Sequence, residues 1–285
     1  MKLKQGINVS YDEYEKSYVF DFSQAKVKKV TSRMFPILLG KNEYQGVGYG
    51  VLERCGFLEF EQIDPYYMVR GALAEYLANL FLIESYKSRG VEIETKTFTP
   101  EQVGYDNFKK NIMFGGVLDI AISSPQEQRA VIEVKSKSLK DLDKIYTQKN
   151  PSQEEVMQGE MLAHLSKVDK LLMVYVFFSP EQEKQLKELV KVNENIGTQE
   201  IMDTLHWELG SFENQIKPIK YIVNHDRIET DMNKAYETLH RMVKLGKIHE
   251  LHFTNEEKFY LNALIQNDNP NMNVNANLDS DEIPF

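Results

Sequence analysis

Three polar side chains in the first half of the sequence have types and spacing that could do chemistry together. Asp119 precedes Glu133 by 14 residues, and Lys135 lies two residues beyond Glu133. Side chains alternate between the two faces of a strand, so Glu133 and Lys135 should point the same way while Val134 points into the core. Two carboxylates beside an ammonium group can hold a hard divalent cation and orient a water molecule.

Two neighbouring strands are needed to bring these side chains together. The segments 117–123 (VLDIAIS) and 130–136 (AVIEVKS) both alternate in the manner of a strand, and the polar SPQEQR between them is typical of a turn. We therefore expect an antiparallel hairpin that places Asp119 beside Glu133. A glycine pair at 115–116 would permit the close approach of a backbone.

Magnesium is the ion that fits such an oxygen-rich site best, with manganese as an alternative. Its expected protein ligands are the carboxylates of Asp119 and Glu133 and the carbonyl of Val134, with several waters retained and one of them becoming the nucleophile. The competing interpretation is that residues 133–137, EVKSK, are only the solvated face of an edge strand.

The flanking segments predict an α/β (mixed) fold with a central mixed β-sheet flanked by helices. A long amphipathic helix is expected at 65–88, opened by Pro65, and a second helix at 153–164. The apolar run LLMVYVFF at 171–178 predicts a strand buried on both faces.

The rest of the chain supplies the outer elements of one domain, expected to cover residues 1–266. The expected outer elements are a strand at 91–99, a capped short helix after Thr31 followed by a glycine-rich loop, a helix at 181–195, a strand at 218–223, and helices at 228–245 and 255–266. Residues 1–25 form a leading segment without a clear period. Residues 267–285, rich in Asn, should be a disordered acidic tail.

Composition excludes several classes of protein. The chain has 285 residues, of which 42% are hydrophobic and 27% charged, as in ordinary globular proteins. Its single cysteine, Cys55, allows no internal disulfide or thiolate metal cluster, and no apolar run is long enough to span a membrane, so a cytoplasmic protein is expected. The net charge of −9 argues against a protein whose whole surface binds phosphate, but it is compatible with a local basic groove.

The Asp119, Glu133 and Lys135 pattern resembles that of the PD-(D/E)xK nuclease superfamily, which implies a restriction-endonuclease-like core. Gly71 and Glu75 in RGALAEYLA are similar to the G-x-x-x-E of the phage lambda-type alkaline exonucleases. That resemblance implies that Glu75 reaches the metal site from a helix.

The same resemblance extends to Gln158 in VMQGEMLAHL, which is similar to a glutamine of that family on the helix after the ExK strand. It implies that Gln158 positions Lys135 and the substrate. Taken alone, Glu75 and Gln158 could equally be solvated side chains on helix surfaces.

Upstream, VTSRMFPILLG resembles the segment in which that family holds a terminal 5′-phosphate. The implied ligands are Ser32 and Arg33, with Lys28 and Lys29 just before them. A hydroxyl, helix N-terminal amides and positive charge together suit a phosphate. The segment is one residue shorter than in the family, and lysines ahead of a helix are most often simply solvated.

The last residues resemble the tip of bacterial single-stranded-DNA-binding proteins. The tip consists of Asp281, Glu282, Ile283, Pro284 and Phe285. A partner pocket could bury the terminal ring and pair the terminal carboxylate with a basic group. The alternative is an acidic solubilising tail.

Together the resemblances imply a magnesium-dependent exonuclease that digests linear duplex DNA from the 5′ end for recombination. They also imply a homotrimer, and a single-strand annealing protein or host repair and replication proteins as partners of the tail. Two alternatives remain: an adaptor that binds DNA ends and recruits partners through the tail, and an endonuclease with the same site.

Two other patterns favour no function. His249 and His252 lie three residues apart without an evident third zinc ligand. Tyr66, Tyr67 and Met68 could stack on bases, but aromatic residues at the start of a core helix usually pack.

Overall fold

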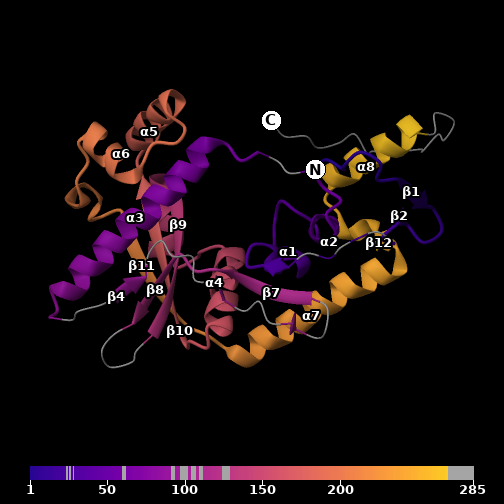
Figure 1. The fold of residues 1–285 in the computed structure, drawn as a ribbon, viewed down its shortest axis with the longest axis horizontal. Coiled ribbons are helices and arrows are strands. Elements are labelled where there is room, and N and C mark those ends of the chain that lie inside the picture. Colours follow the sequence, from indigo (N-terminus) through magenta and orange to yellow (C-terminus); the bar gives the residue numbers. More distant parts are fainter. Residues whose placement is uncertain are drawn as a thin grey trace.

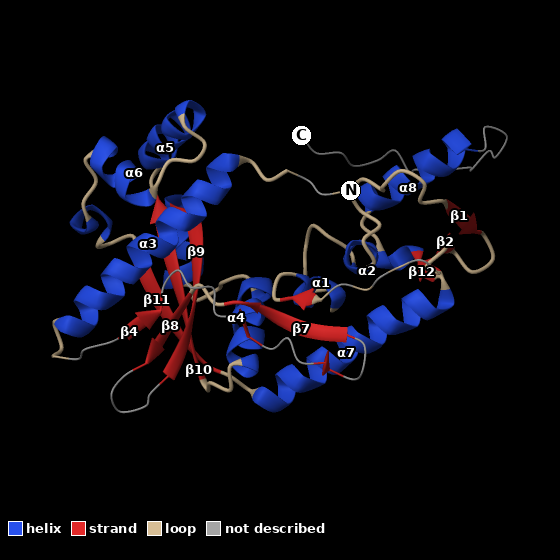
Figure 2. Cartoon of the chain, in the orientation of Figure 1, coloured by secondary structure: helices blue, strands red, loops and turns tan. Residues whose placement is uncertain are grey.

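The structure is a computed structural model that describes residues 1–23, 25, 27, 29–59, 62–90, 94–96, 102–103, 107–108, 112–123 and 129–268. Helices and strands alternate along much of the chain (Figures 1 and 2). The strands are β1 Val9–Asp12, β2 Ser17–Phe20, β3 Val30–Thr31, β4 Glu94–Lys96, β5 Gln102–Val103, β6 Asn107–Phe108, β7 Ile112–Val117, β8 Ile120–Ser123, β9 Arg129–Ser138, β10 Lys170–Phe178, β11 Ile216–Ile222 and β12 Lys247–His249. The α-helices are α1 Met34–Leu38, α2 Val47–Arg54, α3 Pro65–Lys87, α4 Gln153–Leu165, α5 Pro180–Val192, α6 Thr198–Leu205, α7 His225–Leu245 and α8 Asn255–Asp268.

The central sheet has five strands in the order β11-β10-β9-β8-β4. β8 and β9 form the expected antiparallel hairpin, with Ile120 opposite Ile132. β10 then pairs parallel to β9 after the crossover helix α4, and β11 pairs antiparallel to β10. The predicted mixed α/β class, with a mixed sheet flanked by helices, is confirmed.

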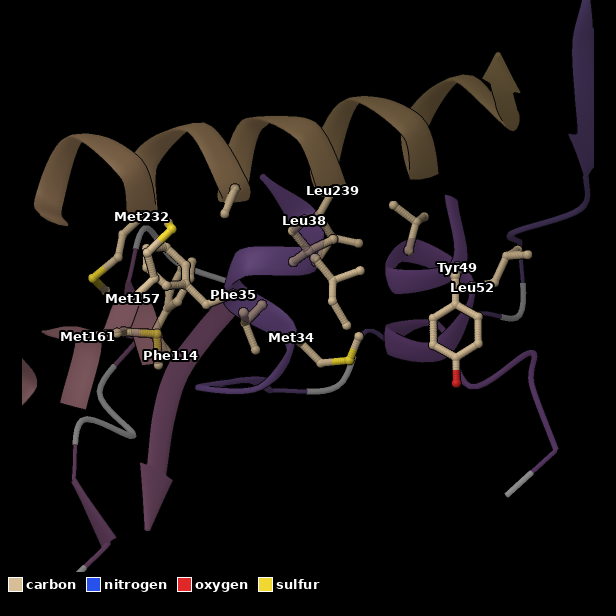
Figure 3. Packing of buried hydrophobic residues seen from close by; sticks show 14 of the residues in the cluster. Met34, Phe35, Leu38, Tyr49, Leu52, Phe114, Met157, Met161, Met232 and Leu239 are labelled. Carbon is tan, nitrogen blue, oxygen red and sulfur yellow. The ribbon is translucent and has the colours of Figure 1, made fainter. Parts of the chain in front are cut away.

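Each face of this sheet carries its own hydrophobic core, because strand side chains alternate. Ile132 and Val134 of β9 lie in the cluster that α3, α5 and α6 complete, whereas Val131 lies in the cluster formed with α1, α4 and α7. On the second face, Phe35 of α1 meets Phe114 of β7 edge to face, between the methionines of α4 and α7 (Figure 3). The sheet is therefore held rigidly from both sides, which fixes the direction of its polar side chains.

The helices that flank the sheet begin where local chemistry predicts. The Asp64 carboxylate caps α3 by accepting a hydrogen bond from the Tyr66 amide at 2.9 Å, and Pro65 occupies the first turn. Ser179 and Gln182 form a reciprocal capping box at the start of α5. The predicted helices at 65–88 and 181–195 are thus confirmed to within a few residues.

A smaller sheet, in the order β3-β7-β5, lies beside the central one, and β6 also pairs with β7. β3 runs parallel to β7, with Thr31 opposite Gly115. This pairing brings the segment after Thr31 to the same edge as the hairpin. The capped helix expected there is wrong in detail: α1 begins after Arg33, and no side chain caps it.

The leading segment is not free-standing, because β1 and β2 pair with each other and β2 pairs with β12 near the end of the chain.

The glycine-rich stretch predicted to be a loop contains the helix α2 instead, so that prediction is wrong. A β-carbon on Gly48 would overlap the ring of Phe253, and one on Gly50 would come within 3.0 Å of Ile37. The glycines allow α2 to pack closely rather than to turn.

Two further predictions fall partly outside the described residues. Of the strand expected at 91–99, the structure describes β4 at 94–96. α8 continues to Asp268, two residues into the expected tail, and the remainder of the tail lies outside the described residues. In the part of the chain that the structure describes, no helix is long and apolar enough to cross a membrane.

Candidate active site

The predicted polar residues come from four neighbouring pieces of backbone. Glu75 projects from α3, Glu133 and Lys135 from β9, and Gln158 from α4. Asp119 does not lie within a strand as expected. It occupies the bend between β7 and β8, because the strand breaks at residues 118–119.

The bend fixes Asp119 through the backbone of the neighbouring strand. The Val134 amide donates a hydrogen bond of 2.8 Å to Asp119 Oδ2. Burial raises the pKa of the Asp119 carboxyl well above its usual range, and repulsion from Glu133 and Glu75 adds to the effect. Asp119 is therefore held close to two other carboxylates that disfavour its charged form.

Lys135 joins the two sides of the site. Its ammonium donates hydrogen bonds to Glu133 Oε1 at 2.7 Å and to Gln158 Oε1 at 2.9 Å. Burial lowers the pKa of Lys135, but the attraction and hydrogen bond of Glu133 and the charge of Asp119 outweigh burial and raise it. The amine is thus a proton donor and a fixed positive charge at neutral pH.

Gln158 is held in turn by its own helix, since its Nε2 donates to Glu154 Oε1 at 3.3 Å. Gln158 as a whole residue is 9% exposed, so it is a buried link between α4 and β9 rather than a surface side chain. Glu75 is partly buried, and burial first and Glu133 second raise its pKa. A β-carbon on Gly71 would meet nothing within 4 Å, so packing does not require glycine there.

The site has more negative charge than its lysine balances. Glu75, Asp119 and Glu133 interact with one another and with the single ammonium of Lys135, and Glu133 Oε2 is buried without a hydrogen-bond partner. An unpaired buried oxygen next to a second carboxylate suits a cation.

Within the described residues, no group of three or more His, Cys, Asp or Glu side chains is arranged to hold a metal ion. Magnesium usually takes only one or two protein carboxylates and completes its shell with water and substrate phosphates. The donors of this site fit a magnesium ion held in that way.

A cavity of about 630 Å³ opens beside Lys135 and Gln158. One wall comes from β9 and the start of α4, and the other comes from the loop between α1 and α2 with Lys41 and Tyr44. Lys137 also lines it, paired with Glu155 at 2.6 Å. This second wall was not predicted, because no local sequence pattern connects residues 41–44 to β9.

The structure brings only some of the residues predicted to bind a 5′-phosphate close to the hairpin. Ser32 lies near Gly116, where an added β-carbon would be 3.4 Å from Ser32 Oγ. Arg33 and Lys29 are exposed, and Lys28 lies outside the described residues. Gly116 itself packs against the side chain of Leu162 of α4. The space that the glycine pair was expected to leave for another backbone is therefore occupied by a helix.

A scan against protein-family models finds no match, and a search of curated proteins finds none either. Among solved structures, the alkaline exonuclease of Laribacter hongkongensis is similar at 13% identity and a TM-score of 0.46, over 79% of this chain and 94% of that one. Its complex with dAMP gives 13% and 0.47 over 77% and 92%, and a phage-related exonuclease from Haemophilus somnus 129PT gives 14% and 0.46 over 76% and 95%. Since these TM-scores lie below 0.5, the function has to be inferred from the residues of the site.

Proposed function

We propose that the chain is a metal-dependent nuclease that hydrolyses phosphodiester bonds of DNA. The observation that carries this proposal is the linked set of Asp119 on the Val134 amide and Lys135 between Glu133 and Gln158. An ordinary surface salt bridge consists of two solvated charges. Here Asp119 also accepts a hydrogen bond from a backbone amide, and Lys135 also donates one to the buried carboxamide of Gln158. Such a set suits catalysis, where charged groups must be held in place before the substrate arrives.

The residues that would hold a magnesium ion are Asp119, Glu133 and the carbonyl of Val134, with Glu75 approaching from α3. A bound ion would neutralise the carboxylates, lower the pKa of a bound water and polarise a phosphate oxygen. Manganese, with similar preferences for oxygen ligands, is the expected substitute.

The protein's own groups have separate tasks in this proposal. Lys135 donates hydrogen bonds to the attacking water or to the phosphate oxygens and offsets their charge. Gln158 keeps the ammonium in position, since its carbonyl oxygen accepts one of the three protons. The cavity beside Lys135 gives a phosphate backbone access to these groups.

The finer proposal is an exonuclease that starts at the 5′ end of a linear duplex and leaves a 3′ overhang for recombination. Ser32 and Arg33, with Lys28 and Lys29, would hold the terminal phosphate; the position of Ser32 next to Gly116 supports this. We further propose a homotrimer in the cytoplasm whose tail, ending in Phe285, recruits an annealing or repair protein.

The test is digestion of end-labelled linear duplex in magnesium, with and without a 5′-phosphate, beside a supercoiled circle of the same sequence. The proposal predicts degradation of the linear form from its ends, faster with the phosphate, and an intact circle. Asp119→Ala and Lys135→Ala variants that still degrade the duplex would refute the nuclease. A nicked or linearised circle would instead make the enzyme an endonuclease.

A further inference from the structure

The start of α3 presents apolar side chains to solvent, although the middle of this helix packs against the sheet. Tyr67 is 55% exposed and Met68 is 62% exposed, and Ile63 just before the helix is 48% exposed. Further along the helix, Leu73 and Leu77 are completely buried. A contiguous group of large exposed apolar residues next to a proposed active site indicates a binding surface.

Cations lie over the aromatic rings of this surface. The Arg70 guanidinium carbon is 5.4 Å from the ring centroids of both Tyr66 and Tyr67. Lys187 Nζ of α5 is 4.9 Å from the centroid of Tyr66. The two rings meet edge to face at 5.1 Å, so Tyr67 is held between Tyr66 and Arg70 while about half of it stays exposed.

Arg70 ties this surface to the proposed catalytic strand. Its Nε donates to Ser136 Oγ at 3.3 Å, and Ser136 directly follows Lys135. Its other end pairs with Glu183 of α5 at 3.3 Å. Tyr67 and Glu75 are eight residues apart on one helix, or about 12 Å along its axis. This distance equals about three to four nucleotides of a stacked strand.

From these contacts we propose that Tyr67, oriented by Tyr66 and Arg70, is a stacking platform for a base of single-stranded DNA. It would bind a nucleotide within about four positions of the scissile phosphate, while the exposed Lys187 attracts the backbone. The inference deepens the proposed nuclease function and rests on it.

The chemistry of the surface favours an unpaired strand over other occupants. Aromatic rings beside cations bind unpaired bases without regard to sequence, because every base has a π-face. In a duplex the faces of the bases are covered by their neighbours, so only the terminal or separated nucleotides could stack on Tyr67.

The experiment measures binding apart from cleavage. Single-stranded oligonucleotides carry 2-aminopurine at one of the first six positions from the 5′ end, and fluorescence is titrated with protein in EDTA, where metal-dependent cleavage is absent. The variants are Tyr67→Ala and Tyr67→Trp, and the matched control is Tyr14→Ala, because Tyr14 is a 96% exposed tyrosine on the β1–β2 hairpin. Thermal unfolding of each variant is recorded in parallel.

The proposal predicts that the wild type quenches 2-aminopurine at one or two adjacent positions. Tyr67→Ala should abolish this quenching and weaken binding between about fivefold and one hundredfold, whereas Tyr67→Trp and Tyr14→Ala retain both. Unchanged affinity and quenching in Tyr67→Ala would overturn the platform, even if the enzyme still cleaves DNA. Loss of binding only together with a lowered melting temperature would also overturn it, because Tyr67 would then be a packing residue. Failure of the nuclease proposal would show separately, as absence of cleavage in magnesium.

Discussion

Neutralising Asp119 should stabilise the metal-free protein while it removes activity. The folded state raises the pKa of this carboxyl through burial first and then through Glu133 and Glu75, so its charged form costs stability at neutral pH. Asp119→Asn keeps an oxygen that can accept from the Val134 amide and removes the charge. We therefore expect Asp119→Asn to be more stable than the wild type in the absence of metal, with a higher melting temperature.

The assay is thermal and urea unfolding of both proteins in EDTA between pH 4 and pH 8. A raised carboxyl pKa costs stability above that pKa, and the cost fades as the pH falls toward the unfolded value of about 3.9. The advantage of Asp119→Asn should therefore be largest near pH 8 and shrink toward pH 4. Magnesium should stabilise the wild type more than the variant. Equal or lower stability of Asp119→Asn in EDTA at neutral pH would show that the charge of Asp119 does not destabilise the metal-free fold.

Two further predictions concern packing and charge away from the site. Gly48→Ala should destabilise the protein by about 1–3 kcal/mol in urea unfolding, because its methyl group would meet Phe253, whereas Gly197→Ala, with nothing within 4 Å, serves as the control. An equal effect of the two changes would contradict the packing described for α2. Arg227→Met should cost about 1–3 kcal/mol because it removes the partly exposed partner of Glu160, whose side chain is 9% exposed, and a second change, Glu160→Met, should recover most of that loss. A double variant no more stable than the single one would contradict this account.

Local periodicity was enough to predict the elements that carry the site. Alternation predicted the β8–β9 hairpin, and helical spacing with Pro65 predicted α3. These features succeed because they depend on residues close together in the chain. The convergence of Glu133 and Lys135 on one face follows from the same alternation.

The features that the sequence did not reveal depend on distant partners. The role of Gly48 depends on Phe253, about two hundred residues away, so a glycine-rich stretch could form a helix against expectation. The leading segment pairs with β12, and Arg70 donates a hydrogen bond to Ser136. Both are tertiary contacts that leave no local pattern in the sequence. The bend at Asp119 also reflects tertiary structure, because its carboxylate accepts from the amide of Val134 in the next strand.

The most direct test of the account is the single-turnover rate of magnesium-dependent cleavage of a linear duplex by Lys135→Met. The matched control is Lys220→Met, an exposed lysine in β11 of the same sheet. If Lys135 positions the reacting groups, its variant should lose at least about 100-fold in rate while Lys220→Met cleaves like the wild type. A Lys135→Met enzyme that cleaves as fast as Lys220→Met would show that Lys135 takes no part in cleavage.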